Sequence, residues 1–243
     1  MVASPVASSK WIDVAGRVRA GEELDVGAVD RWLKGVVPDL LGTPEVTQYS
    51  GGASNWTYRL KYPDHDLILR RPPAGTRAKS AHDMRREYRV QDALRPSYPW
   101  VPGMVGLCED ESVLGAEFYV MERLEGVIPR GKMALGLGLS AGQNRVLCTH
   151  VLDKLVELHR VDPNTAGLAS LGKGPGYCKR QVEGWSERYV KARTRNVPTF
   201  QRVRAWLAEH TPADVATCVI HNDFRLDNVV LDPGEPTRVI GVL

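Results

Sequence analysis

Apolar and polar residues alternate in several short segments of the N-terminal half, as is typical of strands with one buried face. The segments Glu45–Tyr49, Trp56–Tyr62 and Leu67–Arg71 follow one another and are separated by residues that form turns. Three such strands in close succession predict an antiparallel sheet. Two further apolar segments, Met104–Cys108 and Glu117–Glu122, are expected to add strands to it, on either side of the turn Glu109–Ser112.

Apolar residues at helical spacing appear on both sides of this strand-rich region. Residues 27–36 predict a small helix ahead of the sheet, and residues 80–94 predict a helix capped by Ser80. Longer amphipathic patterns follow at residues 140–161, 177–195 and 199–210. Apolar residues of the last two helices are expected to face a core, among them Trp185, Val190, Val203 and Trp206.

The change from strands to helices marks a lobe boundary near residue 124. Residues 1–124 would form a small N-terminal lobe around the antiparallel sheet, together with the preliminary helix. Residues 125–243 would form a mainly helical C-terminal lobe. The predicted fold class is therefore α+β with two lobes.

Composition and charge narrow the possible partners. The chain has 243 residues, 43% hydrophobic and 25% charged, as in ordinary globular proteins. Its net charge of +3 is too small and too dispersed to indicate nucleic-acid binding. No apolar run approaches the roughly 18 residues of a membrane span. Four widely spaced cysteines predict reduced thiols and a cytoplasmic protein, with no zinc site.

A polar loop near the end of the chain carries the strongest chemical signal. His221, Asp223 and Asn228 stand in the spacing His-x-Asp-x4-Asn, between the apolar runs Cys218–Ile220 and Val229–Leu231. We interpret the runs as two short strands that hold the loop. Asp223 could accept a proton from a hydroxyl, Asn228 could offer an oxygen to a divalent cation, and His221 could brace the loop. The alternative is a polar turn without chemistry.

The connection between the first two strands is rich in glycine. Gly51 and Gly52 would let the backbone approach a phosphate closely, and Ser54 and Asn55 would add hydrogen-bond donors. An ordinary hairpin turn is the alternative, because paired glycines are common there.

One cation and one carboxylate could complete a nucleotide site. Arg70 alternates with Leu69 on its strand, so it could face inward, where it would need an anionic partner. Glu87, in the middle of the following helix, is a candidate for that partner. Backbone groups of Glu122–Leu124, at the end of the strand Glu117–Glu122, could hold an adenine.

Together these residues resemble the aminoglycoside phosphotransferase and choline kinase family, whose members share the protein-kinase-like fold. The resemblance covers nearly everything from about residue 40 onward. One branch is especially similar: bacterial phosphotransferases and the kinase-like domains at the front of some acyl-CoA dehydrogenases. The motifs that carry it are Gly51-Gly52-Ala-Ser54-Asn55-x-Thr57-Tyr58, Leu-Arg70-Arg71-Pro72-Pro73, Arg86-Glu87-Tyr88, Phe118-Tyr-Val-Met121-Glu122-Arg-x-Glu-Gly126, Leu158-His159-x-Val161-Asp162 and His221-Asn-Asp223-Phe-Arg225-Leu-Asp227-Asn228.

The resemblance implies a role for each site residue. Asp223 would be the catalytic base, supported by His221, and Asn228 would be a magnesium ligand. Arg70 would take the place of the lysine usual in kinases and pair with Glu87. The remaining nucleotide-binding residues would be Gly51, Gly52, Ser54, Asn55, Met121, Glu122 and Leu124.

The family usually has a second magnesium-binding aspartate soon after the catalytic loop. The sequence ends at Leu243, where that residue would come next, so the helical lobe is expected to be incomplete in this chain. The cofactors implied are ATP and Mg²⁺, and the partner is a small substrate with a hydroxyl group. ATP or GTP, the acceptor and the oligomeric state stay open. A catalytically silent nucleotide-binding or interaction module of the same fold is the alternative function.

Overall fold

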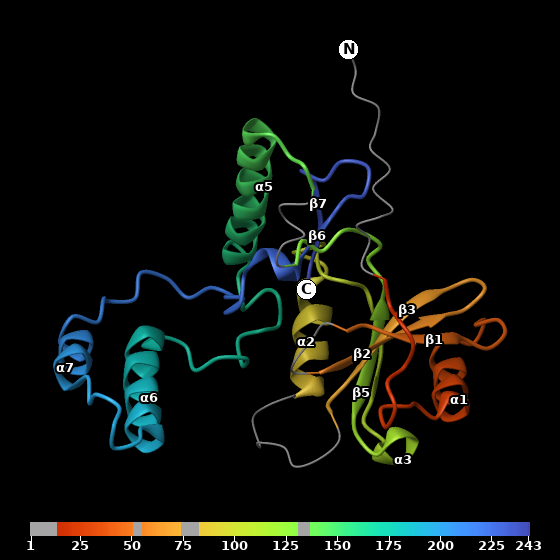
Figure 1. Cartoon of the computed structure of the whole chain (residues 1–243), viewed down its shortest axis with the longest axis horizontal. Coiled ribbons are helices and arrows are strands. Elements are labelled where there is room, and N and C mark those ends of the chain that lie inside the picture. The colour runs from red at the N-terminus through yellow and green to blue at the C-terminus, as the bar shows by residue number, and fades with distance from the viewer. Residues whose placement is uncertain (1–13, 51–54, 74–82, 131–136) are drawn as a thin grey trace. The chain divides into compact units, whose positions relative to one another are not determined.

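The computed structural model describes residues 14–50, 55–73, 83–130 and 137–243 (Figure 1). Two compact units are present: residues 1–158 together with 221–243, and residues 159–220. The change from strands to helices occurs as expected, since β5 ends at Glu122 and the long helix α5 begins at Ala141. The functional division at residue 124 stays a prediction.

A five-stranded antiparallel sheet forms the centre of the first unit. Its strands are β1 (Glu45–Gln48), β2 (Trp56–Lys61), β3 (Asp66–Arg71), β4 (Met104–Cys108) and β5 (Phe118–Glu122). Their order is β1-β2-β3-β5-β4, and every neighbouring pair is antiparallel. The sheet predicted from the alternating pattern is confirmed.

The two faces of this sheet pack against different helices. Leu67 and Leu69 of β3 pack with Val29 and Leu33 of helix α1 (Val26–Val36). Ile68 lies on the opposite face and packs with Met84 of helix α2 (Met84–Leu94). Strand periodicity explains the division, because successive side chains point to opposite faces. Arg70, two residues after Ile68, therefore shares the face covered by α2.

Two local elements differ from the sequence expectation. Helix α2 begins at Met84, because the Asp83 side chain caps it by accepting the N–H of Arg86. The expected cap, Ser80, lies outside the described residues. Glu111 and Ser112, predicted to lie in a turn, instead form one helical turn, α3 (Glu111–Leu114), because Asp110 caps it and Gly115 ends it with a positive φ of 73°.

The loop after residue 220 leads into a hairpin of β6 (Val229–Leu231) and β7 (Val239–Val242). Val127 and Leu231 exchange backbone hydrogen bonds of 2.9 and 2.8 Å. The N–H of Val242 also donates to the carbonyl of Trp100 over 2.8 Å. These bonds join the hairpin to the segments that flank β4 and β5.

The strand expected at Cys218–Ile220 does not form. Residues 211–220 have no regular secondary structure, and no strand in the described ranges pairs with them. An apolar run of three residues needs a neighbouring strand to complete its hydrogen bonds. The loop is therefore held on one side by β6 and on the other by side-chain contacts.

Helix α5 (Ala141–His159) belongs to the first unit up to Leu158 and is tied to it by side chains. The Tyr98 hydroxyl donates to the carbonyl of Lys154 over 3.0 Å, and Trp100 Nε1 donates to Glu157 over 2.6 Å. His150 Nδ1 lies 2.7 Å from the carbonyl oxygen of Thr237, between β6 and β7.

The second unit contains helices α6 (Tyr177–Ala192) and α7 (Gln201–Glu209). Contrary to expectation, neither helix has a buried residue in the described structure. Trp185 is 62% exposed, and Trp206 is 56% exposed. The apolar positions follow the predicted helical spacing, but within this unit the two helices have only each other and short connections to pack against. No helix in the described ranges is both long and apolar enough to cross a membrane.

Candidate active site

The loop from His221 to Asn228 folds around its own side chains. Its last three residues, Leu226–Asn228, form a short 3-10 helix that leads directly into β6. Asn222 adopts a positive φ of 66°, a conformation that asparagine tolerates better than most residues. The loop places Asp223 on the surface, where a substrate could reach its carboxylate.

Asn228 holds Asp223 with its amide group. The Nδ2 atom donates to the backbone carbonyl of Asp223 over 2.8 Å and to its Oδ2 over 3.1 Å. Both bonds use the amide nitrogen, which leaves the amide oxygen of Asn228 as the group suited to bind a cation. The other carboxylate oxygen of Asp223, Oδ1, takes no part in these bonds and is the one that a substrate hydroxyl could use.

His221 braces the same loop through both ring nitrogens. Its Nδ1 accepts the backbone N–H of Asp223 over 3.3 Å, and its Nε2 lies 2.9 Å from the carbonyl oxygen of Leu243. A carbonyl can only accept, so the proton of a neutral ring belongs on Nε2. The ring also makes an edge contact with Phe224. The bracing contacts predicted for His221 are thus present, and its catalytic role stays a prediction.

The expected pair between Arg70 and Glu87 is also present. Arg70 Nη1 lies 3.5 Å from Glu87 Oε2. Glu87 accepts two further hydrogen bonds, from the Tyr119 hydroxyl at 3.0 Å and from Asn55 Nδ2 at 2.9 Å. Burial raises the pKa of Tyr119, so its hydroxyl remains a donor at neutral pH.

One donor at this pair has no acceptor. The Nε of Arg70 is buried and makes no hydrogen bond within the described ranges. A buried donor of a cationic side chain is costly without a partner. The Arg70 side chain as a whole is 27% exposed, so a ligand such as a phosphate could reach part of it.

The segment Glu122–Leu124, which begins with the last residue of β5, is called the connecting segment below. Its first two N–H groups complete the sheet, since Glu122 donates to Gly103 over 2.8 Å and Arg123 donates to Asp66 over 3.0 Å. The Leu124 N–H makes no hydrogen bond among the described residues. Of the three residues predicted to hold an adenine through backbone groups, Leu124 is therefore the one whose N–H a ligand could use. Met121 is buried on the α2 face beside Tyr49.

Magnesium fits these residues only in part. The described residues contain no group of three histidine, cysteine or acidic side chains that could bind a metal ion. Mg²⁺ in kinase-type sites commonly takes one or two protein oxygens and completes its coordination with phosphate oxygens and water. Asn228 would supply one such oxygen. The predicted phosphate-loop residues Gly51, Gly52 and Ser54 lie outside the described residues.

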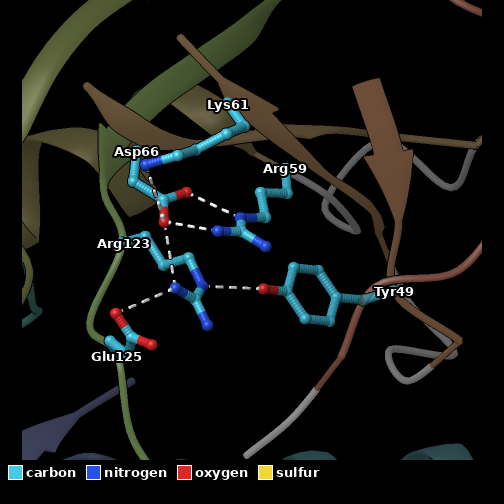
Figure 2. Close-up of polar contacts among 6 residues, drawn as sticks. All are labelled: Tyr49, Arg59, Lys61, Asp66, Arg123 and Glu125. Carbon is cyan, nitrogen blue, oxygen red and sulfur yellow. Dashed lines mark hydrogen bonds and ion pairs between the residues drawn. The ribbon is translucent and has the colours of Figure 1, made fainter. Parts of the chain in front are cut away.

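Sequence reasoning missed several residues around this site. Tyr119 was not assigned, although it joins Glu87 to the sheet. A cluster of charged side chains around Asp66 and Arg123 was also missed (Figure 2). Strand alternation could have indicated part of it, because Asp66, Ile68 and Arg70 share one face of β3.

Comparisons with known proteins agree with the fold. The family model described as "Phosphotransferase enzyme family" matches residues 45–243. Acyl-CoA dehydrogenase family member 10 of Mus musculus is 36% identical over 227 residues, which are 93% of this chain and 21% of that protein. The chain thus spans about a fifth of that relative's length.

Solved structures share the same architecture. The crystal structure of a "putative aminoglycoside phosphotransferase" from Ralstonia eutropha has a TM-score of 0.78 and 34% identity, covering 91% of this chain and 64% of that one. A streptomycin–ATP–APH(2")-IIa ternary complex has a TM-score of 0.58 at 18% identity, covering 90% of this chain and 69% of that one, so it supports the fold alone.

These matches confirm the expected branch and the protein-kinase-like fold, with an antiparallel sheet in the N-terminal part. The chain belongs to the phosphotransferase enzyme family.

Proposed function

We propose that this chain carries the nucleotide-binding and catalytic residues of an ATP- and Mg²⁺-dependent small-molecule kinase. The reaction would transfer the γ-phosphate of ATP to a hydroxyl group of the substrate. The observation that carries the proposal is the Asp223 carboxylate, exposed and held by the Asn228 amide in a loop braced by His221.

Asp223 would act as the catalytic base. Its carboxylate would accept the hydroxyl proton as the substrate oxygen attacks the γ-phosphorus in line. The bond from Asn228 restricts the carboxylate to one orientation, so it need not be ordered again for each reaction. Mg²⁺, when bound, would offset the negative charge of the phosphates, and the Asn228 amide oxygen would help hold it.

Arg70 would bind the nucleotide phosphates. Its side chain is partly exposed, and Glu87 keeps the guanidinium in place. Arginine differs from the lysine usual in kinases because its planar group can donate to two phosphate oxygens at once. The Leu124 N–H is the donor we assign to the adenine ring. We also propose a cytoplasmic location, because the enzyme would use ATP and its cysteines form no disulfide.

The phosphate acceptor is a compound with a hydroxyl group, and its identity within that class is left open. Hydroxyl-bearing metabolites, acyl derivatives and aminoglycosides all offer the required nucleophile. A screen of these compounds for ATP and GTP consumption, with the protein in its natural full-length form, would identify the acceptor and the nucleotide.

Replacement of Asp223 by asparagine tests the proposal. We expect Asp223→Asn to lower the transfer rate by about 10²- to 10⁴-fold, the usual contribution of a general base. Nucleotide affinity should be nearly unchanged, because the base faces the acceptor. The measurements are ATP consumption with the acceptor found in the screen and calorimetric titration with Mg²⁺ and ATP.

The matched control is Glu235→Gln, which changes a carboxylate in the turn after β6 whose side chain is 65% exposed. It should leave the transfer rate close to that of the natural protein. Full activity of Asp223→Asn would refute the base assignment. Binding of ATP without any turnover in the natural protein would favour the silent module instead.

A further inference from the structure

Asp66 lies between two guanidinium groups where three segments of the chain meet (Figure 2). Arg59 of β2 donates from Nε and Nη2 to the two carboxylate oxygens, both over 2.7 Å. Arg123 of the connecting segment donates from Nη1 to Asp66 Oδ2 over 3.0 Å. Such paired bonds restrict both position and orientation of the groups.

Arg123 extends this cluster to the end of β1. Its Nε donates to the Tyr49 hydroxyl over 3.1 Å, as Figure 2 shows. The Arg123 side chain is only 6% exposed, and Tyr49 is 8% exposed. A guanidinium at this depth needs its partners, because an unpaired buried charge is strongly unfavourable.

Asp66 remains ionised within the cluster. Burial by itself would raise the pKa of Asp66, but the hydrogen bonds of Arg59 and the charge of Arg123 outweigh it and lower the pKa. The carboxylate therefore holds both guanidinium groups across the neutral pH range.

The location of these contacts suggests more than a contribution to stability. Tyr49 directly follows β1 and precedes the predicted phosphate-binding connection between β1 and β2. Arg123 lies inside the connecting segment, next to Leu124, to which we assign the base. A nucleotide that binds at both places needs them at one separation, because its base and phosphates are covalently joined.

We propose that Arg123 is a positioning residue that links the β1 end at Tyr49 to the connecting segment, so that base and phosphates of one nucleotide are bound together. This inference rests on the proposed nucleotide-binding function. It adds a residue network, Tyr49–Arg123–Asp66–Arg59, that touches neither end of the nucleotide and acts through the segments that do.

Replacement of Tyr49 by phenylalanine tests the link with little change in packing. The ring stays in place and only the hydroxyl is lost. We expect the affinity for ATP with Mg²⁺ to fall by about 5- to 10-fold, in the range for one lost hydrogen bond. Affinity for adenosine, which lacks phosphates, should fall by less than about 2-fold. Calorimetric titration of the full-length protein gives both constants.

Arg123→Lys is the second variant. Lysine keeps the positive charge but cannot donate to Tyr49 and Asp66 in the same planar geometry. The double variant Tyr49→Phe/Arg123→Lys should lose no more ATP affinity than Arg123→Lys alone, since both remove the same link. Additive losses would contradict the linked action of the two residues.

Lys61→Gln is the matched control. Lys61 Nζ lies 3.9 Å from Asp66, and its side chain is 47% exposed, so this ion pair should contribute little. The control should bind ATP and adenosine like the natural protein. Thermal melting of each variant verifies that it is folded.

Three outcomes would overturn the inference. Unchanged ATP affinity in Tyr49→Phe would show that the link has no effect. Equal losses for ATP and adenosine would assign the network a structural role only. If the natural protein binds neither ligand, the proposed function itself fails, and this result is distinct because it appears before any substitution.

Discussion

Glu87 is the residue on which most of the described nucleotide-site contacts converge. It receives Arg70 from β3, the Tyr119 hydroxyl from β5 and the Asn55 amide from the start of β2. The carboxylate of Glu87 therefore joins helix α2 to β3, to β5 and to the residue that precedes β2. The pairing of Arg70 with Glu87 followed from strand alternation and helix position, whereas the Tyr119 contact depends on a neighbour that is distant in sequence.

Replacing Glu87 by glutamine should weaken nucleotide binding. Loss of the carboxylate charge leaves the Arg70 guanidinium without its anion and free to turn from the phosphate position. We expect ATP affinity to fall by about tenfold, equivalent to the loss of about 1.4 kcal/mol. Calorimetric titration would measure it. Glu109→Gln, which changes an exposed partner of Arg85, is the control and should bind normally. Normal affinity in Glu87→Gln would contradict a role for the pair.

At the scale of elements, the β6–β7 hairpin sets the place of the catalytic loop. Its attachment to Val127 requires a close approach at Gly126, where an added Cβ would lie 2.5 Å from the carbonyl oxygen of Leu231. Glycine is needed here for space, since a backbone oxygen cannot move aside as a side chain can.

Gly126→Ala should therefore displace the hairpin and destabilise the protein by about 1–3 kcal/mol, the usual cost of overpacking. The midpoint of urea unfolding would measure the loss. Gly184→Ala offers a matched control within α6, where the added methyl group meets nothing within 4 Å. That variant should be more stable by about 0.5–1 kcal/mol, because alanine favours the helix. Equal stability of the two variants would contradict the close approach at Gly126.

At the scale of the whole molecule, the first unit is rich in buried tyrosines. Tyr58, Tyr62, Tyr98 and Tyr119 are all at most 1% exposed. Burial raises the pKa of each hydroxyl, and for Tyr58 it does so from 10.0 to about 12. The Tyr58 hydroxyl donates to the carbonyl of Glu22, a bond that requires its proton.

The protein should consequently lose stability in alkali. In the unfolded chain tyrosine loses its proton near pH 10, while in the folded protein Tyr58 retains it to about pH 12. The unfolded state therefore binds fewer protons between these values, and the free energy of unfolding falls as pH rises. Urea unfolding between pH 8 and 12 would measure this fall. Tyr58→Phe should reduce the slope, and an unchanged slope would exclude Tyr58 as a source.

Helices α6 and α7 show what the sequence pattern predicts and what it does not. Spacing predicted α6 and α7 correctly as helices, yet their apolar faces, with Trp185 and Trp206, are exposed. Periodicity reports which face of a helix is apolar, and it does not report what covers that face. The absent strand at Cys218–Ile220 has the same explanation. A strand needs a neighbouring strand to pair with, and a short apolar run does not show whether one is present.

The sequence by itself determined the sheet, the helices, the fold family and the loop from His221 to Asn228. These features depend on local spacing and on short motifs, so they can be predicted from neighbouring residues in the sequence. Only the tertiary structure decided that Asn228 holds Asp223 through its amide nitrogen and that Tyr119 and Asn55 share Glu87 with Arg70. It also brought Tyr49, Asp66 and Arg123 together. Such contacts join residues up to 74 positions apart, and their geometry follows from strand register and burial, which no local pattern encodes.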